Sequence, residues 1–114
     1  MIVETSELHG MSLDWAVAKC EGANDAELIL LFSEQYKSSS WKTMFSGSWA
    51  LAGPIIEREK IWLAGPYKER TEWYADASDP SRAYGPTPLV AAMRCYVLSK
   101  MGDSIDVPDA IANK

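Results

Sequence analysis

Residues 85–103 constrain the fold more than any other part of the chain, because they carry signals for both ends of one helix. Thr87 can accept a hydrogen bond from an N–H group of the first turn. Pro88 suits the first helical position, where a missing N–H costs nothing, and Gly102 suits the residue that ends a helix. The residues between are apolar around most of the helix, with Arg94 as a lone charge in the middle. Such a helix belongs inside a fold, so the rest of the chain must cover it.

A second long helix is predicted over residues 11–21, where apolar residues recur on one wide face. Residues 61–63 and 71–77 have the pattern of two strands, and the turn residues between them predict a hairpin. Residues 53–60 predict a short helix that begins at Pro54. The remaining segments are predicted as a first strand at 2–5, a strand at 28–32 with a helix over 25–32 as the alternative, a loop at 33–48, a polar loop at 78–84 and an edge strand at 105–107.

These elements predict one domain over residues 1–114, long enough to bury a single hydrophobic core. The expected fold class is α+β, with a small, mainly antiparallel sheet packed against two long helices. No signal peptide is expected, since Glu4 and Glu7 interrupt any apolar run near the start. No segment is long and apolar enough to cross a bilayer, so no membrane association is expected.

The net charge of −5 disfavours binding to duplex nucleic acid, because phosphate backbones attract basic surfaces. An acidic surface suits a basic protein partner, or serves solubility alone. Two cysteines, Cys20 and Cys95, and one histidine are too few for a zinc site. Both cysteines lie in predicted helices on an apolar background, so we expect free, buried thiols. Neither a metal nor a cofactor is expected.

The motifs of common enzyme classes are missing. With His9 as its single histidine and no G-x-S-x-G motif, the sequence does not offer a hydrolytic triad. The sequence contains neither of the two common Gly-rich phosphate-binding motifs, G-x-x-x-x-G-K-[ST] and G-x-G-x-x-G. Glu57 and Glu59 lie two residues apart, on different sides of a helix, which favours a solvated acidic surface over an acid–base pair. We therefore expect a protein that is not an enzyme.

Arg94 is the most specific of the candidate functional residues. Its neighbours three and four residues away along the helix are all apolar, so its guanidinium must find a hydrogen-bond partner. One interpretation is an internal ion pair with a carboxylate, for which Glu57, Glu59 and Asp76 are the candidates. The other is an anion-binding site, in which Thr87 and free N–H groups of the first helical turn complete the contacts of Arg94.

The five Trp and five Tyr residues all offer stacking surfaces for a base or a sugar, and six of them fall into two groups. Aromatic residues at periodic positions are expected in the core, namely Trp15, Trp73 and Tyr96. Those in predicted loops are candidates for contacts with a protein, a base or a sugar, namely Trp41, Trp49 and Tyr84. Arg58 or Arg82 beside such rings could hold a nucleotide. Alternatively, Trp41 and Trp49 fold back over the core.

Three blocks of the sequence resemble one protein family. They are LDWAVAKCEG at 13–22, GPIIEREKI at 53–61 and the capped helix at 85–103, in the family's order. In these blocks the chain is similar to the NinX-like proteins of tailed bacteriophages and prophages. The resemblance implies a small intracellular phage accessory protein in an enterobacterial or similar host. It implies no reaction, and it carries over no catalytic residue.

Taken together, these observations predict a non-catalytic bacteriophage accessory protein that binds a host or phage protein in the host cytoplasm. The alternative is a domain that binds or sequesters a small anionic, nucleotide-like ligand. A homodimer is compatible with both. The candidate binding residues are Trp41, Trp49, Arg58, Tyr84, Thr87 and Arg94.

Overall fold

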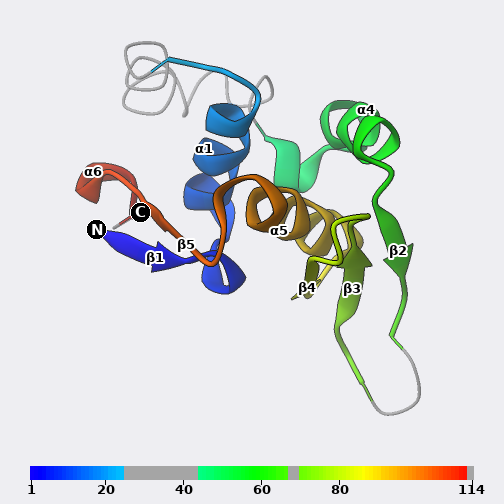
Figure 1. Cartoon of the computed structure of the whole chain (residues 1–114). Coiled ribbons are helices and arrows are strands. Elements are labelled where there is room, and N and C mark those ends of the chain that lie inside the picture. Colours follow the sequence, from blue (N-terminus) through cyan, green and yellow to red (C-terminus); the bar gives the residue numbers. More distant parts are fainter. Residues whose placement is uncertain (25–43, 67–69, 113–114) are drawn as a thin grey trace.

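The computed structural model describes residues 1–24, 44–66 and 70–112 (Figure 1). The helices and strands follow in this order: β1 (Ile2–Glu4), η1 (Thr5–Glu7), α1 (Gly10–Cys20), η3 (Phe45–Gly47), α4 (Trp49–Glu59), β2 (Trp62–Ala64), β3 (Trp73–Asp76), β4 (Arg82–Gly85), α5 (Pro88–Met101), β5 (Ser104–Asp106) and α6 (Asp109–Ala112). The predicted strand at 28–32 and Trp41 lie outside the described residues. No helix in the described ranges is both long and apolar enough to cross a membrane.

Helix α5 lies at the centre of the fold and has the predicted ends. The Thr87 hydroxyl accepts a hydrogen bond from the Val90 amide at 3.1 Å, and Pro88 is the first helical residue. Gly102 ends the helix with a φ of 86°, a conformation that glycine adopts without strain. Figure 1 shows α5 between α1 on one side and strands β3 and β4 on the other, so its apolar circumference is covered from both sides.

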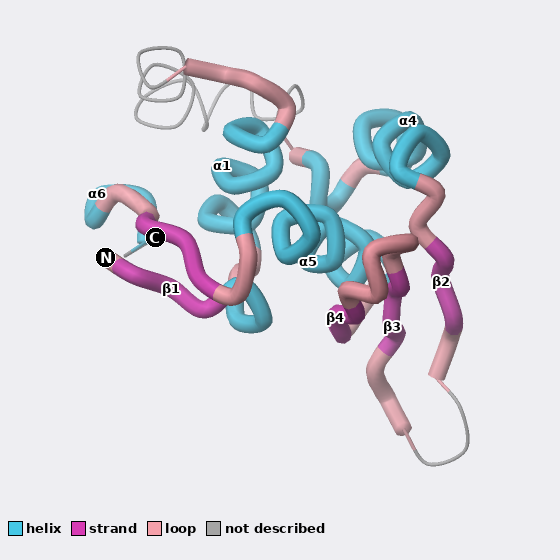
Figure 2. Tube along the Cα trace, viewed as in Figure 1, coloured by secondary structure: helices cyan, strands magenta, loops and turns pink. Residues whose placement is uncertain are grey.

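The strands form two antiparallel sheets, which confirms the α+β class but divides the one expected sheet into two. Strands β1 and β5 pair through Val3 and Ile105, so the predicted first and edge strands are neighbours (Figure 2). Strands β2, β3 and β4 form the second sheet in that order, which confirms the predicted hairpin. The loop prediction for 78–84 was wrong in its last part, because residues from Arg82 onward pair with β3 as a third strand.

Helix α1 confirms the prediction for 11–21 to within a residue, and its apolar face is buried against α5. Asp14 is buried on this helix, and its carboxylate accepts a hydrogen bond from the Ser46 amide at 2.9 Å. This contact ties η3 to α1, so the chain that enters α4 has a fixed position.

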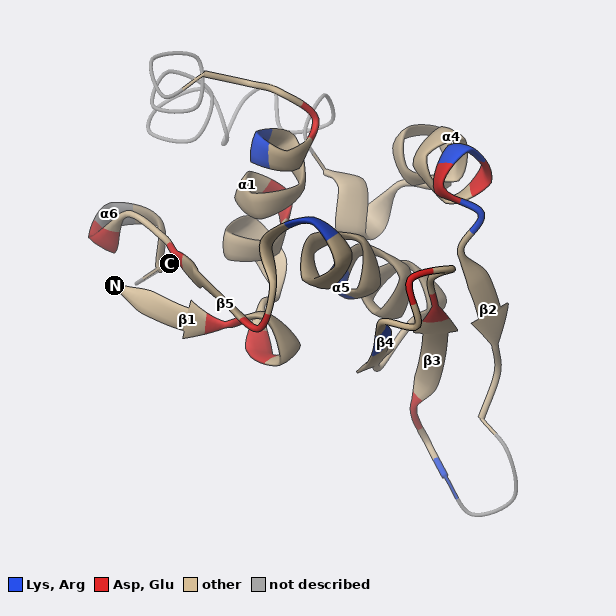
Figure 3. Ribbon diagram, viewed as in Figure 1, with Lys and Arg blue, Asp and Glu red and all other residues tan. Residues whose placement is uncertain are grey.

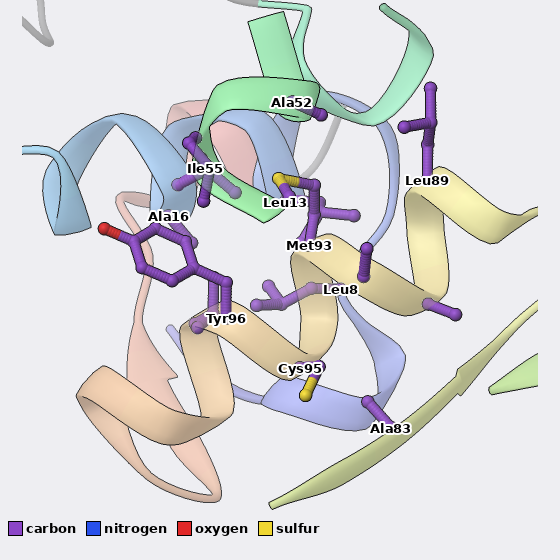
Figure 4. Close-up of a cluster of buried hydrophobic side chains, with 14 of the residues drawn as sticks. Leu8, Leu13, Ala16, Ala52, Ile55, Ala83, Leu89, Met93, Cys95 and Tyr96 are labelled. Atoms are coloured by element: carbon purple, nitrogen blue, oxygen red, sulfur yellow. The ribbon is translucent and has the colours of Figure 1, made fainter. Parts of the chain in front are cut away.

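Helix α4 begins five residues earlier than predicted, at Trp49 instead of Pro54. The Ser48 hydroxyl accepts a hydrogen bond from the Leu51 amide at 3.4 Å, and this cap sets the start of the helix. Pro54 therefore lies inside α4, where its ring removes one backbone hydrogen bond. Burial of Ala52 and Ile55 in the core offsets that loss (Figure 4).

The hydrophobic core lies between α5 and the elements around it. Trp15 and Tyr96 are buried there, as predicted, and Trp73 packs against the core while remaining half-buried. Figure 4 shows Met93 of α5 near Leu13 of α1 and Ile55 of α4. The core thus joins all three long helices, and α5 is the element that they share.

Candidate functional site

The three-stranded sheet has one face against α5 and one face toward solvent. On the inner face, Leu63, Ala75 and Ala83 lie in one row across the strands, and both alanines are buried. Because side chains alternate along a strand, the residues before and after this row point outward. We call these outward residues the outer face; they are Trp62, Ala64, Tyr74, Asp76, Arg82 and Tyr84.

Trp62 is the most exposed aromatic residue of the outer face, with 78% of its surface accessible to solvent. It lies on the edge strand β2, opposite Asp76. Sequence reasoning did not select Trp62 as a binding residue, because it gave preference to aromatic residues in loops. The alternation of the predicted hairpin carried the missing signal, since it places Trp62 on the face opposite to Leu63.

Arg82 and Asp76 form a two-point ion pair across the neighbouring strands. The Arg82 Nε and Nη2 atoms donate to the two Asp76 carboxylate oxygens, at 2.5 and 2.8 Å. This hydrogen bonding holds the pKa of Asp76 below its usual value. The Arg82 guanidinium also lies 4.6 Å from the centre of the Tyr74 ring. The pair therefore fixes both side chains on the outer face.

Tyr84 lies in strand β4 and not in a loop, which corrects the reason for selecting it. Its ring is partly exposed and lies 6.2 Å from the ring of Tyr74, centre to centre. The nearby Arg82 and Arg70 side chains favour the charged phenolate and so lower the pKa of Tyr84. Figure 3 shows the basic segments on β4 and before β3 from which the two arginines come.

Arg94 binds two backbone carbonyls from distant parts of the chain. Its Nε donates to the Leu8 oxygen at 2.7 Å, and its Nη1 donates to the Tyr84 oxygen at 2.8 Å. The prediction of an ion pair with Glu57, Glu59 or Asp76 was wrong: within the described part of the chain, no carboxylate lies within 4.0 Å of the guanidinium. Burial without such a partner lowers the pKa of Arg94.

A groove of about 790 Å³ opens over Arg94. Its walls come from β4, from the β1–η1 segment and from the start of β5, while α5 contributes Arg94 and Leu98. No buried side-chain nitrogen or oxygen among the described residues lacks a hydrogen-bond partner. The Nη2 group of Arg94 makes no hydrogen bond to the described protein. Since no buried polar atom there lacks a partner, Nη2 must be accessible to solvent, and Arg94 is one of the residues that line the groove.

Thr87 does not take part in this groove. Its hydroxyl caps α5 by accepting from Val90, so this N–H group is not free for an anion. The predicted combination of Arg94 with Thr87 and the first helical turn is therefore not the arrangement found. The structure instead brings Arg94 together with Tyr84, although the sequence offers no signal that links the two residues.

Arg58 lies in a different environment, at the end of α4 (Figure 3). It donates to both carboxylate oxygens of Glu21, at 3.2 and 2.7 Å, and to Glu59 at 2.9 Å. The Tyr96 hydroxyl donates a hydrogen bond to the Glu21 carboxylate at 2.5 Å, and the Lys100 ammonium forms an ion pair with Glu59 at 2.9 Å. We call these five residues the helix network. The contacts with Arg58 lower the pKa of both Glu21 and Glu59.

Trp49 is the first residue of α4 and is 55% exposed, so it does not fold back over the core. Both cysteines are free, as predicted, although only Cys95 is fully buried. Burial raises the pKa of Cys20 to about 12 and that of Cys95 to about 11, so both thiols are protonated at neutral pH. The described ranges contain no group of three or more His, Cys, Asp or Glu side chains placed to hold a metal ion.

Comparison with known proteins addresses the family of this chain. No curated protein sequence matches it. The family described as "Bacteriophage P22, NinX" matches residues 4–100, which include every described element from η1 to β4 and nearly all of α5. A match over most of the chain shows common descent, and it confirms the resemblance seen in the three sequence blocks. The chain therefore belongs to the bacteriophage P22 NinX family.

Proposed function

We propose that this phage protein is a non-catalytic accessory protein that binds a host or phage protein in the host cytoplasm, and that the outer face is its contact surface. The observation that carries the proposal is the exposure of Trp62 on a sheet face that also contains Tyr74 and Tyr84. Trp, Tyr and Arg are the residues that contribute most binding energy in protein interfaces.

The rigidity of the outer face supports this proposal. The ion pair of Arg82 with Asp76 and the contact of Arg82 with Tyr74 hold these side chains before a partner arrives. A surface ordered in advance loses less conformational entropy on binding. The proposal includes no catalysis, because the sequence lacks the motifs of hydrolytic and phosphate-binding enzymes.

The test compares three forms of the full chain, purified gently from phage-infected cells and weighed by native mass spectrometry. Trp62→Ala removes the exposed ring, while Ile2→Ser removes a side chain of similar exposure, 68%, from the other sheet. We expect a protein-sized adduct on the parent and on Ile2→Ser that is lost with Trp62→Ala. Circular dichroism verifies that both variants fold. An adduct that survives Trp62→Ala, or no protein adduct on the parent, contradicts the proposal.

The same spectra test the remaining possibilities. An adduct with the mass of a second copy indicates a homodimer and replaces the proposed heterologous partner. An adduct of a few hundred daltons indicates the alternative, a small anionic ligand. The groove over Arg94 is the feature that favours this alternative, and its chemistry is developed below.

A further inference from the structure

Arginine side chains are concentrated around Tyr84. The chain has four arginines, and three of them, Arg70, Arg82 and Arg94, lie around this residue. Arg82 and Arg94 line the groove together with Tyr84, Arg70 lines the adjoining opening with it, and Arg94 also donates to the Tyr84 backbone oxygen. They come from three separate places in the sequence, so only the fold brings them together.

The orientation of these groups leaves donors available. Arg94 uses Nε and Nη1 for the carbonyls of Leu8 and Tyr84, which aims its accessible Nη2 group away from both. Arg82 uses Nε and Nη2 for Asp76, and no described acceptor is hydrogen-bonded to its Nη1. Planar guanidinium groups fixed in this way can bind a phosphate with two donors each. Their prior ordering reduces the entropy lost on binding.

The openings beside Tyr84 bring most of the arginines of this acidic protein close together. A second opening, lined by Arg70, Thr71, Glu72 and Tyr84, adjoins the groove over Arg94, which Glu72 and Tyr84 also line. Three carboxylates act on the three arginines, namely Asp76, Glu72 and Glu7, so the charges at the Tyr84 end balance. The other end of the groove has Glu4 and Asp103. A small anion with one phosphoryl group suits this balance better than a triphosphate or a polymer.

We propose that this arginine cluster binds the phosphoryl group of a nucleoside monophosphate whose base stacks on the exposed ring of Tyr84. Aromatic side chains stack on bases of any sequence, and the partly exposed Tyr84 ring lines both openings beside the arginines. This inference goes beyond the proposed protein interaction. The two sites share Arg82 and Tyr84 of the outer face, and a different variant tests each of them.

The experiment is isothermal titration calorimetry on the full chain with adenosine 5′-monophosphate, adenosine and inorganic phosphate as separate probes. We expect the monophosphate to bind more tightly than either part alone. Arg70→Gln should weaken its binding about tenfold or more, since a charge-assisted hydrogen bond contributes about 1.5–3 kcal/mol. Arg70 is exposed and lies outside the core, so this variant is expected to fold.

Lys60→Gln is the matched control, because it removes one exposed positive charge from the end of α4. The monophosphate should bind this variant as it binds the parent. Equal losses with Arg70→Gln and Lys60→Gln, or no heat with the monophosphate at millimolar concentration, would overturn the site. Phosphate that binds as tightly as the monophosphate would overturn the assignment of the base to the Tyr84 ring. Each result is separable from the protein-binding test, which rests on Trp62→Ala and a protein-sized mass.

Discussion

Arg58 of the helix network and Arg94 of the arginine cluster use the same side chain in opposite ways. In the helix network, Arg58 is surrounded by carboxylates that match its charge, from Glu21 and Glu59. In the cluster, Arg94 is held by backbone oxygens, which carry no net charge. The first arrangement closes a surface between three helices, whereas the second leaves positive charge facing a groove. For Arg58 and Arg94, the partners, more than the burial, therefore decide how much unmatched positive charge remains.

The largest effect is expected from Arg94→Ala. This change removes two hydrogen bonds from a charged donor and leaves the Leu8 and Tyr84 oxygens without it. The expected loss of unfolding free energy is about 3 kcal/mol, measured by urea denaturation. Arg94→Lys should recover only part of it, because one ammonium cannot reach both oxygens with the same geometry. A stability equal to that of the parent would show that Arg94 does not brace the fold.

A smaller loss is expected from Gly85→Ala, at the corner between β4 and α5. An added Cβ would lie 2.7 Å from the Ala91 amide nitrogen and 2.9 Å from a methyl carbon of Val90. Overpacking of this kind costs about 1–3 kcal/mol. The matched control is Gly53→Ala in α4, where an added Cβ meets nothing within 4 Å. That change should raise the melting temperature, because alanine favours a helix by up to about 1 kcal/mol over glycine.

Acid should weaken the helix network selectively. The pKa of Glu21 is lowered first by Arg58 and then by Tyr96, so its stabilising effect is present above the unfolded pKa of about 4.3. As the pH falls from there through the folded pKa, the carboxylate is protonated and this contribution is lost. Because Arg58 is half exposed, we expect about 1 kcal/mol at neutral pH. Glu21→Gln should lower stability at pH 7 and flatten its decline toward pH 3, measured by thermal melts.

Arg58→Ala should flatten the same decline, because it removes the main cause of the lowered pKa. A decline that keeps its full steepness in both variants would assign the acid sensitivity to other carboxylates. Asp76, whose pKa is lowered by Arg82, is then the next group to change.

The smallest effect is expected at Lys60, which ends α4 in the left-handed conformation with φ 55° and ψ 45°. A residue with a Cβ is strained there, and glycine is not. Lys60→Gly should therefore raise the unfolding free energy by about 0.5–1 kcal/mol, without changing the monophosphate affinity predicted for the cluster. A lower melting temperature would mean that the lysine side chain makes a contribution larger than this strain.

The two long helices that were predicted correctly, α5 and α1, carry their signals within their own residues. Helix α5 followed from its two caps, and α1 followed from the period of its apolar residues, because both signals lie within the element itself. Strand β4 has four residues and is held by its pairing with β3, so its sequence alone resembles a polar loop. The start of α4 depended on the Ser48 cap, which competes with the signal of Pro54.

The candidate site was less predictable, because its contacts join distant residues. The partners of Arg94 are carbonyls 86 and 10 positions away, and every residue type has a carbonyl, so no residue pattern identifies them. The grouping of Arg70, Arg82 and Tyr84 depended on the register of β3 and β4. The alternation in the predicted hairpin already separates Tyr74 and Asp76 from Trp73 and Ala75, and it places Trp62 on the face opposite to Leu63.

The pairing of β1 with β5 has a consequence for the order of folding. Ile2 lies opposite Asp106, so the first strand waits for nearly the whole chain before its partner exists. The hairpin of β2 and β3 closes a far shorter loop. Each doubling of loop length adds only about 0.6 kcal/mol to the entropic cost of closing the loop. Contacts between residues far apart in the sequence nevertheless form more slowly. During synthesis, α5 can pack on the three-stranded sheet while β1 is still unpaired. The two-stranded sheet is therefore expected to be the last part of the molecule to form.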